Sequence, residues 1–119
     1  MADEITVNSS LQYVKGGRTL LSRGVINQKA TQTGNNTGGG IFTCTTAERA
    51  LAISEVATAG WTWIQNLDAT NYVEIGPATG SYLLKLKAGV GCAVPLDKTT
   101  LYVKANAASV DVEIWMLEE

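Results

Sequence analysis

The side chains best suited to binding chemistry lie in the stretch GWTWIQNLDATNYVEIG, residues 60–76. Large aromatic rings beside amide and carboxylate groups are the composition expected at the centre of a protein–protein interface. The same rings could stack on a sugar, but sugar sites usually gather several amides or carboxylates, and only two such groups are near in this sequence. The candidate interface residues are Trp61, Trp63, Gln65, Tyr72 and Glu74.

A four-residue loop at 67–70 would fold this stretch into a β-hairpin, with Trp63 opposite Glu74 and Ile64 opposite Val73. Burying Glu74 without a partner would be costly, so the aromatic face is expected to meet water or a partly polar interface. A bulge or an odd loop length would exchange the faces and place both tryptophans in the core, which remains an alternative. The expected core face consists of Thr62, Ile64, Val73 and Ile75.

Catalytic chemistry is not expected. The sequence has no histidine, which removes the commonest general base and the usual transition-metal ligand. The carboxylate pairs Asp111 with Glu113 and Glu118 with Glu119 fall on an expected strand or at the chain end, outside any recognised cleft motif. No nucleophile elbow or metal-ligand spacing occurs. The sequence therefore predicts no catalytic residue, no metal, no cofactor and no enzyme.

Charge and hydropathy bear on the partners. Nine basic and eleven acidic residues give a net charge of −2 without a basic block, so nucleic acid is not an expected partner. No apolar run is long enough to span a bilayer, and the acidic start MADEITVNSS lacks export features, which predicts synthesis in the cytoplasm and no membrane partner. Cys44 and Cys92 are expected to be two small buried thiols.

Alternation of apolar and polar residues dominates the chain and predicts strands. With short turns between the strands, the pattern predicts an all-β, single-domain antiparallel β-sandwich over residues 1–119, with a jelly roll as one solution. The expected strands have their apolar residues at Ile5, Val7, Leu11 and Tyr13; Tyr82, Leu84 and Leu86; Val90, Cys92, Val94 and Leu96; Leu101 and Val103; and Val110, Val112, Ile114 and Met116.

Two segments depart from this pattern. Residues 31–40, TQTGNNTGGG, are expected to form a flexible surface loop that a neighbouring subunit could order. Residues 45–57 have a helix-capping spacing from Thr45 to Glu48, but Leu51 and Ile53 favour a short strand followed by a turn near 57–60. The loop positions that a partner could order are Gly34, Asn35, Asn36, Thr37, Gly38, Gly39 and Gly40.

Four motifs between about Thr45 and Glu119 stand out: the NLDATN corner, the KLKAG strand end, the PLDKTTLY turn and the final strand VDVEIWMLEE. In these motifs the chain resembles small structural proteins of tailed bacteriophages. The resemblance implies a β-sandwich component of the virion, and specifically a capsid decoration (cement) protein. Such a protein would be synthesised in the host cytoplasm and would lie on the capsid exterior.

The resemblance also implies partners. A decoration protein would form a homotrimer and bind the major capsid protein at capsomer junctions, where it would stabilise the shell. Two other roles remain open. One is a tail or neck structural protein or a small receptor-binding knob that binds a host glycan through Trp61, Trp63 and Tyr72. The other is a free binding module in the cytoplasm.

Overall fold

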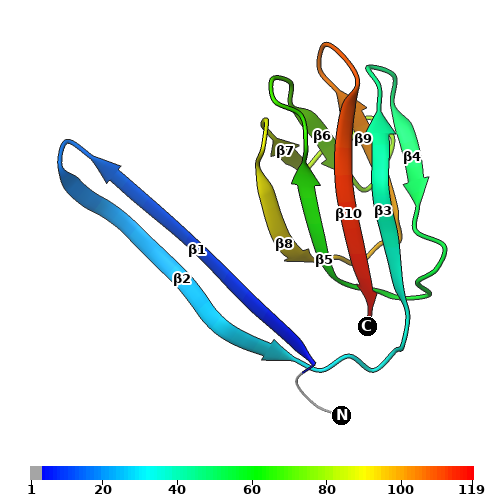
Figure 1. Ribbon diagram of the computed structural model, residues 1–119, viewed down its shortest axis with the longest axis horizontal. Coiled ribbons are helices and arrows are strands. Elements are labelled where there is room, and N and C mark those ends of the chain that lie inside the picture. Colours follow the sequence, from blue (N-terminus) through cyan, green and yellow to red (C-terminus); the bar gives the residue numbers. More distant parts are fainter. Residues whose placement is uncertain (1–3) are drawn as a thin grey trace. The chain divides into compact units, whose positions relative to one another are not determined.

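The computed structural model describes residues 4–119, which are all-β, and every strand pair in them is antiparallel (Figure 1). The chain divides into two compact units that separate between Thr33 and Gly34. The single domain expected over residues 1–119 stays a prediction. Every residue of the main buried cluster comes from the second unit.

The first unit is a two-stranded hairpin of β1 (Ile5–Lys15) and β2 (Arg18–Ala30). Its turn has Gly16 at φ 62° and Gly17 at φ 74°, as a type I′ turn requires. The expected strand from Ile5 is confirmed, but its expected half-burial is not. Among the large apolar residues of β1, only Val7 is buried.

The second unit is a β-sandwich of two four-stranded sheets. The first sheet has the order β3-β10-β5-β8, and the second has the order β4-β9-β6-β7. The chain changes sheet at every connection except the one from β6 to β7 (Figure 1). The strands are β3 (Thr37–Cys44), β4 (Arg49–Ala52), β5 (Ala59–Asn66), β6 (Val73–Gly76), β7 (Leu84–Leu86), β8 (Gly91–Pro95), β9 (Thr100–Ala105) and β10 (Val110–Glu118).

The core lies between the two sheets and is built by alternation. Ile64 and Ile114 point inward from the first sheet, and Val73 and Val103 point inward from the second. All four side chains are essentially fully buried, which is where β-branched residues stabilise a sandwich most. The strands expected near 82–86, 90–96, 101–103 and 110–116 are confirmed as β7 to β10.

The expected hairpin between β5 and β6 does not form, because the two strands belong to different sheets. The corner between them crosses from one sheet to the other, and polar side chains stabilise the crossing. The buried Asn66 amide donates to the carbonyls of Asn71 (2.9 Å) and Leu86 (2.9 Å) and accepts from the N–H of Asp68 (2.8 Å). The Asp68 carboxylate accepts from the N–H groups of Thr70 and Asn71.

The Gly-rich segment 31–40 is only partly a loop, because residues 37–40 belong to β3 and pair with β10. Glycine is required there by close approach. At Gly39, φ is 131° and a Cβ would lie 1.9 Å from the carbonyl oxygen of Ile114. The glycines for which a flexible loop was expected thus let the edge strand β3 pass close to β10.

Residues 45–57, for which the sequence allowed a helix or a strand, contain the strand β4. Leu51 on β4 and Ile53 just after it are both buried in the core. A turn at Ser54 and Glu55 follows, a few residues before the expected turn near 57–60, and β5 already begins at Ala59. Residues 4–119 include no helix of the length and apolarity needed to cross a membrane.

Candidate functional site

All three tryptophans of the chain lie on the outer face of the first sheet, which we call the tryptophan face. Trp63 on β5 is directly opposite Trp115 on β10, and Trp61 lies two residues before Trp63 on the same side. Trp63 is 39% exposed and Trp115 is 47% exposed. Ile41, on the neighbouring strand β3, is 62% exposed. This is a contiguous apolar surface across three neighbouring strands of one sheet.

The tryptophan face is also acidic. The Nε1–H of Trp63 donates to the carboxylate of Glu113 at 3.2 Å, which fixes the indole beside a negative charge. Asp111, two residues earlier on β10, accepts a hydrogen bond from the hydroxyl of Thr43 at 2.8 Å. The four strands of this sheet contain no lysine or arginine. An apolar partner with a positive charge would therefore be complementary to this face.

A glycine on the edge strand makes space for one of the rings. Gly91 on β8 pairs with Gln65 on β5, next to Trp63. A Cβ at Gly91 would lie 3.0 Å from Cζ2 of the Trp63 indole. The Trp63 ring therefore lies over Gly91, and this packing holds the ring along the sheet.

Of the predicted interface residues, the structure brings together Trp61, Trp63 and Gln65 and separates Tyr72 and Glu74 from them. Glu74 lies on β6 in the second sheet, between the inward-facing Val73 and Ile75, so its side chain is on the opposite outer face of the sandwich. The five residues do not share one face, because the expected pairing of β5 with β6 does not occur.

The residues left on the second sheet have partners of their own. In the strand register, Glu74 is opposite Lys85 on β7 and Lys104 on β9. The Lys85 ammonium also lies 4.3 Å from the centre of the Tyr72 ring. Neither Tyr72 nor Glu74 contributes to the tryptophan face.

Trp115, Ile41 and Glu113 belong to the tryptophan face but were not among the residues predicted from the sequence. The signal for Trp115 and Glu113 was present, since the inward alternation from Val110 to Met116 puts both on the solvent side of the same strand. A tryptophan on the polar side of an amphipathic strand therefore indicates an exposed ring and a candidate interface residue. Ile41 carried no such signal, because glycines surround its strand.

The predicted partner-ordered loop is instead held by its own chain. The carboxylate of Glu118 accepts hydrogen bonds from the N–H of Ala57 at 3.0 Å and of Asn35 at 3.1 Å, and the Asn36 amide lies at 3.4 Å. These hydrogen bonds, the one from Ala57 foremost, lower the pKa of Glu118. The N–H of Gly39 donates to Glu55 at 3.2 Å.

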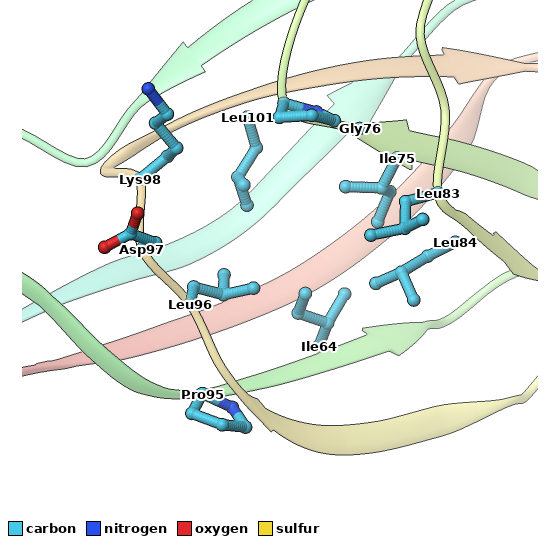
Figure 2. A pocket seen from close by; sticks show the side chains of 11 residues that line it. Ile64, Ile75, Gly76, Leu83, Leu84, Pro95, Leu96, Asp97, Lys98 and Leu101 are labelled. Atoms are coloured by element: carbon cyan, nitrogen blue, oxygen red, sulfur yellow. The ribbon is translucent and has the colours of Figure 1, made fainter.

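A second candidate site is an apolar pocket of about 350 Å³ between the two sheets, beside the edge strands β7 and β8 (Figure 2). Leu83, at its rim, is 84% exposed. Its charged lining residues are Asp97 and Lys98. Its apolar walls suit an apolar group rather than a hydroxyl-rich sugar. The apolar side chains that converge on it include Ile64, Ile75, Leu84, Leu96 and Leu101.

Two groups that could act as nucleophiles are held in their protonated forms. Burial raises the pKa of the Cys44 thiol to about 11. The phenol of Tyr82 donates to Glu48, which raises its pKa to about 12. Cys44 is buried and Cys92 is half-buried, and they lie on the two opposite edge strands of the first sheet, too far apart for a disulfide.

Among residues 4–119, no three Cys, Asp or Glu side chains come together in a way that could hold a metal ion. Comparison of the chain with protein-family models, with curated proteins and with solved structures found no match.

Proposed function

We propose that this chain is a structural protein of a tailed-bacteriophage particle, and specifically a capsid decoration (cement) protein on the capsid exterior. The observation that carries the proposal is the tryptophan face. Exposed tryptophans and Ile41 on the outer face of one sheet form the kind of apolar surface that marks a protein–protein contact. The resemblance to phage structural proteins supplies the particle to which this contact belongs.

The proposed mechanism is mechanical and includes no enzymatic step. Each copy would bury its apolar surface against the major capsid protein at a capsomer junction and against other copies in a homotrimer. Burial of complementary surface holds each contact, and repetition over many junctions multiplies the effect. The shell would then resist the outward pressure of packaged DNA.

We also propose that the sandwich is a jelly roll, an architecture found in viral capsid and lectin domains. The sheet orders β3-β10-β5-β8 and β4-β9-β6-β7 support this, because the first and last strands of the sandwich pair and the chain alternates between sheets. This architecture fits a virion protein without requiring one.

Protein quantification and electron microscopy of purified, washed particles test the proposal. A decoration protein should be present in proportion to the number of capsomers and should appear as density on the head. A small fixed copy number on the tail or neck, or absence from washed particles, would contradict it.

Binding to particles that lack the protein tests the surface. Trp115→Ala should weaken this binding, whereas Glu74→Ala, a substitution on the other outer face, should not. Equal binding by Trp115→Ala would mean that the tryptophan face makes no contact, with the shell or with another copy, on which attachment to the particle depends.

A second candidate function is a tail or neck knob that binds a host glycan on the tryptophan face. The observation that favours it is the position of Glu113 and Gln65 beside the Trp63 ring, because a sugar needs both a ring to stack on and polar groups to bind its hydroxyls. Titration with host surface polysaccharide should then change the tryptophan fluorescence, and Trp63→Ala should abolish the change. An unchanged spectrum would remove this candidate.

A further inference from the structure

The β1–β2 hairpin is an amphipathic ribbon with one uncovered apolar face. Cross-strand register places Tyr13 opposite Leu21 and Leu11 opposite Arg23, and these side chains share one side of the ribbon. Leu11 is 64% exposed, and Val25, opposite Ser9 on the same side, is 49% exposed. The other side carries mostly polar residues, although Val14, 54% exposed, also lies on it, and the exposed Leu20 and Ile26 lie at the two bulges of β2. Its polar and small residues are Thr6, Ser10, Gln12, Ser22, Gly24 and Lys29.

The ribbon has a defined shape. Asn27 has φ 57° at a bulge, and its N–H donates to the side chain of Asn8 at 2.8 Å, so the bulge is held by a hydrogen bond. Lys29 donates to the hydroxyl of Thr6 at 2.8 Å across the strands. A lone two-stranded hairpin is at best marginally stable in water. Covering its apolar face would supply the missing stability.

Charge indicates what covers this face. Residues 4–33 contain four basic residues and one acidic residue, a net charge of +3. Residues 34–119 contain five basic and nine acidic residues, a net charge of −4. Two hairpins packed face to face would bring like charges together, with Arg23 in the middle of each apolar face. An acidic apolar surface is the complementary partner.

We propose that the apolar face of the hairpin in one copy packs against the tryptophan face of a second copy. The match is chemical on both sides. Leu11 and its neighbours would cover the exposed rings, and Arg23 would meet Glu113 among the indoles, where a guanidinium can pair with the carboxylate and stack on a ring.

Such a contact is heterologous, because it joins two different surfaces, the hairpin of one copy and the tryptophan face of the next. Contacts of this type close into a ring when the rotation between copies allows it, and three copies would give the proposed homotrimer. The inference rests on the self-association part of the proposed function but not on a place in the virion. It can therefore fail on purified protein while the particle measurements stand, and the reverse also holds.

The test is a charge exchange on the full-length purified protein, with mass measured by size-exclusion chromatography and light scattering at micromolar concentration. The wild type should be an oligomer. Arg23→Glu and Glu113→Arg should each weaken association roughly tenfold or more, and the double variant should restore it. Gln12→Glu, which puts a negative charge on the opposite side of the ribbon, is the control and should remain oligomeric.

Each other outcome would overturn the inference. A monomeric wild type would mean that no second copy covers the hairpin. An oligomer that is unaffected by Glu113→Arg would point to hairpin–hairpin packing or to another surface. Loss of association in both single variants without rescue in the double variant would mean that Arg23 and Glu113 do not meet.

Discussion

The hairpin and the sandwich are built from the same alternating pattern, yet only the sandwich buries it. In the sandwich, the alternating residues of β10 meet those of a second sheet, and Ile114 has no exposed surface. In the hairpin, Leu11 alternates with polar residues just as regularly but has no second layer to meet. Alternation thus determines which side of a strand is apolar, whereas the presence of another layer determines whether that side is covered.

The largest difference in stability is expected between two alanine substitutions, one in the sandwich and one in the hairpin. Ile114→Ala should lower the free energy of unfolding by about 4 kcal/mol, because it empties a fully buried site. Leu11→Ala, measured in the monomeric Arg23→Glu background, should change it by less than about 0.5 kcal/mol. Urea denaturation followed by fluorescence measures both. Equal losses would mean that the hairpin is part of the sandwich core.

The edge strand β3 offers a matched pair of glycines. Gly39→Ala should destabilise the sandwich by at least about 3 kcal/mol, because the new methyl group would collide with the Ile114 carbonyl in addition to the strain of a positive φ. Gly40→Ala has a similar φ, 145°, but open space, and should cost only about 1–2 kcal/mol. Equal effects in thermal unfolding would contradict the close approach to β10.

The crossing between the two sheets depends on Asn66. Asn66→Ala should cost about 3 kcal/mol, since it leaves two buried carbonyls and one N–H without their hydrogen-bond partner. Gln65→Ala, one residue earlier on the outer side, should cost less than about 0.5 kcal/mol. Chemical denaturation of both variants checks this, and a small loss at Asn66 would show that the corner does not need its amide.

Trp63→Ala should weaken assembly more than folding. We expect a loss of about 1.5 kcal/mol in unfolding free energy, because the ring is 39% exposed, and a weakening of self-association on the order of tenfold. Denaturation and light scattering on the same sample compare the two effects. A folding loss of about 3–5 kcal/mol with unchanged association would identify the ring as a core residue.

The smallest expected effect is a pH dependence at Glu118. Its pKa in the folded protein is lowered from the ordinary value of 4.5, so its stabilising contribution is present above pH 4.5 and is lost as the pH falls through the folded pKa. Glu118→Gln should flatten the decline of the urea midpoint below pH 4.5. Glu119→Gln removes the same charge without these hydrogen bonds, and identical curves for both variants would contradict the role of Glu118.

Much of the fold could be predicted because alternation is local. The pattern from Val110 to Met116 and the inward position of Ile64 follow from a period of two, and both are confirmed. Pairing is not local, so the same pattern could not show that β5 and β6 enter different sheets. For β2 the pattern itself fails, because bulges near Leu20 and Asn27 interrupt the period.

The candidate site was predicted in part for the same reason. Trp61, Trp63 and Gln65 lie on one side because they alternate within one strand. Trp115 and Ile41 join them only through strand neighbours distant in sequence, and Tyr72 is removed by the sheet crossing. The residues of one strand that lie on this face could be predicted from alternation. Which strands contribute to the face depends on the sheet topology.

Backbone hydrogen exchange, compared between the wild type and the monomeric Arg23→Glu variant, tests most directly the claim that the sandwich stabilises itself whereas the hairpin needs a second copy. We expect the amides of β10 to be protected in both proteins, and the amides of β1 and β2 to be protected only in the wild-type oligomer. Equal protection of β1 and β2 in the two proteins would contradict this claim.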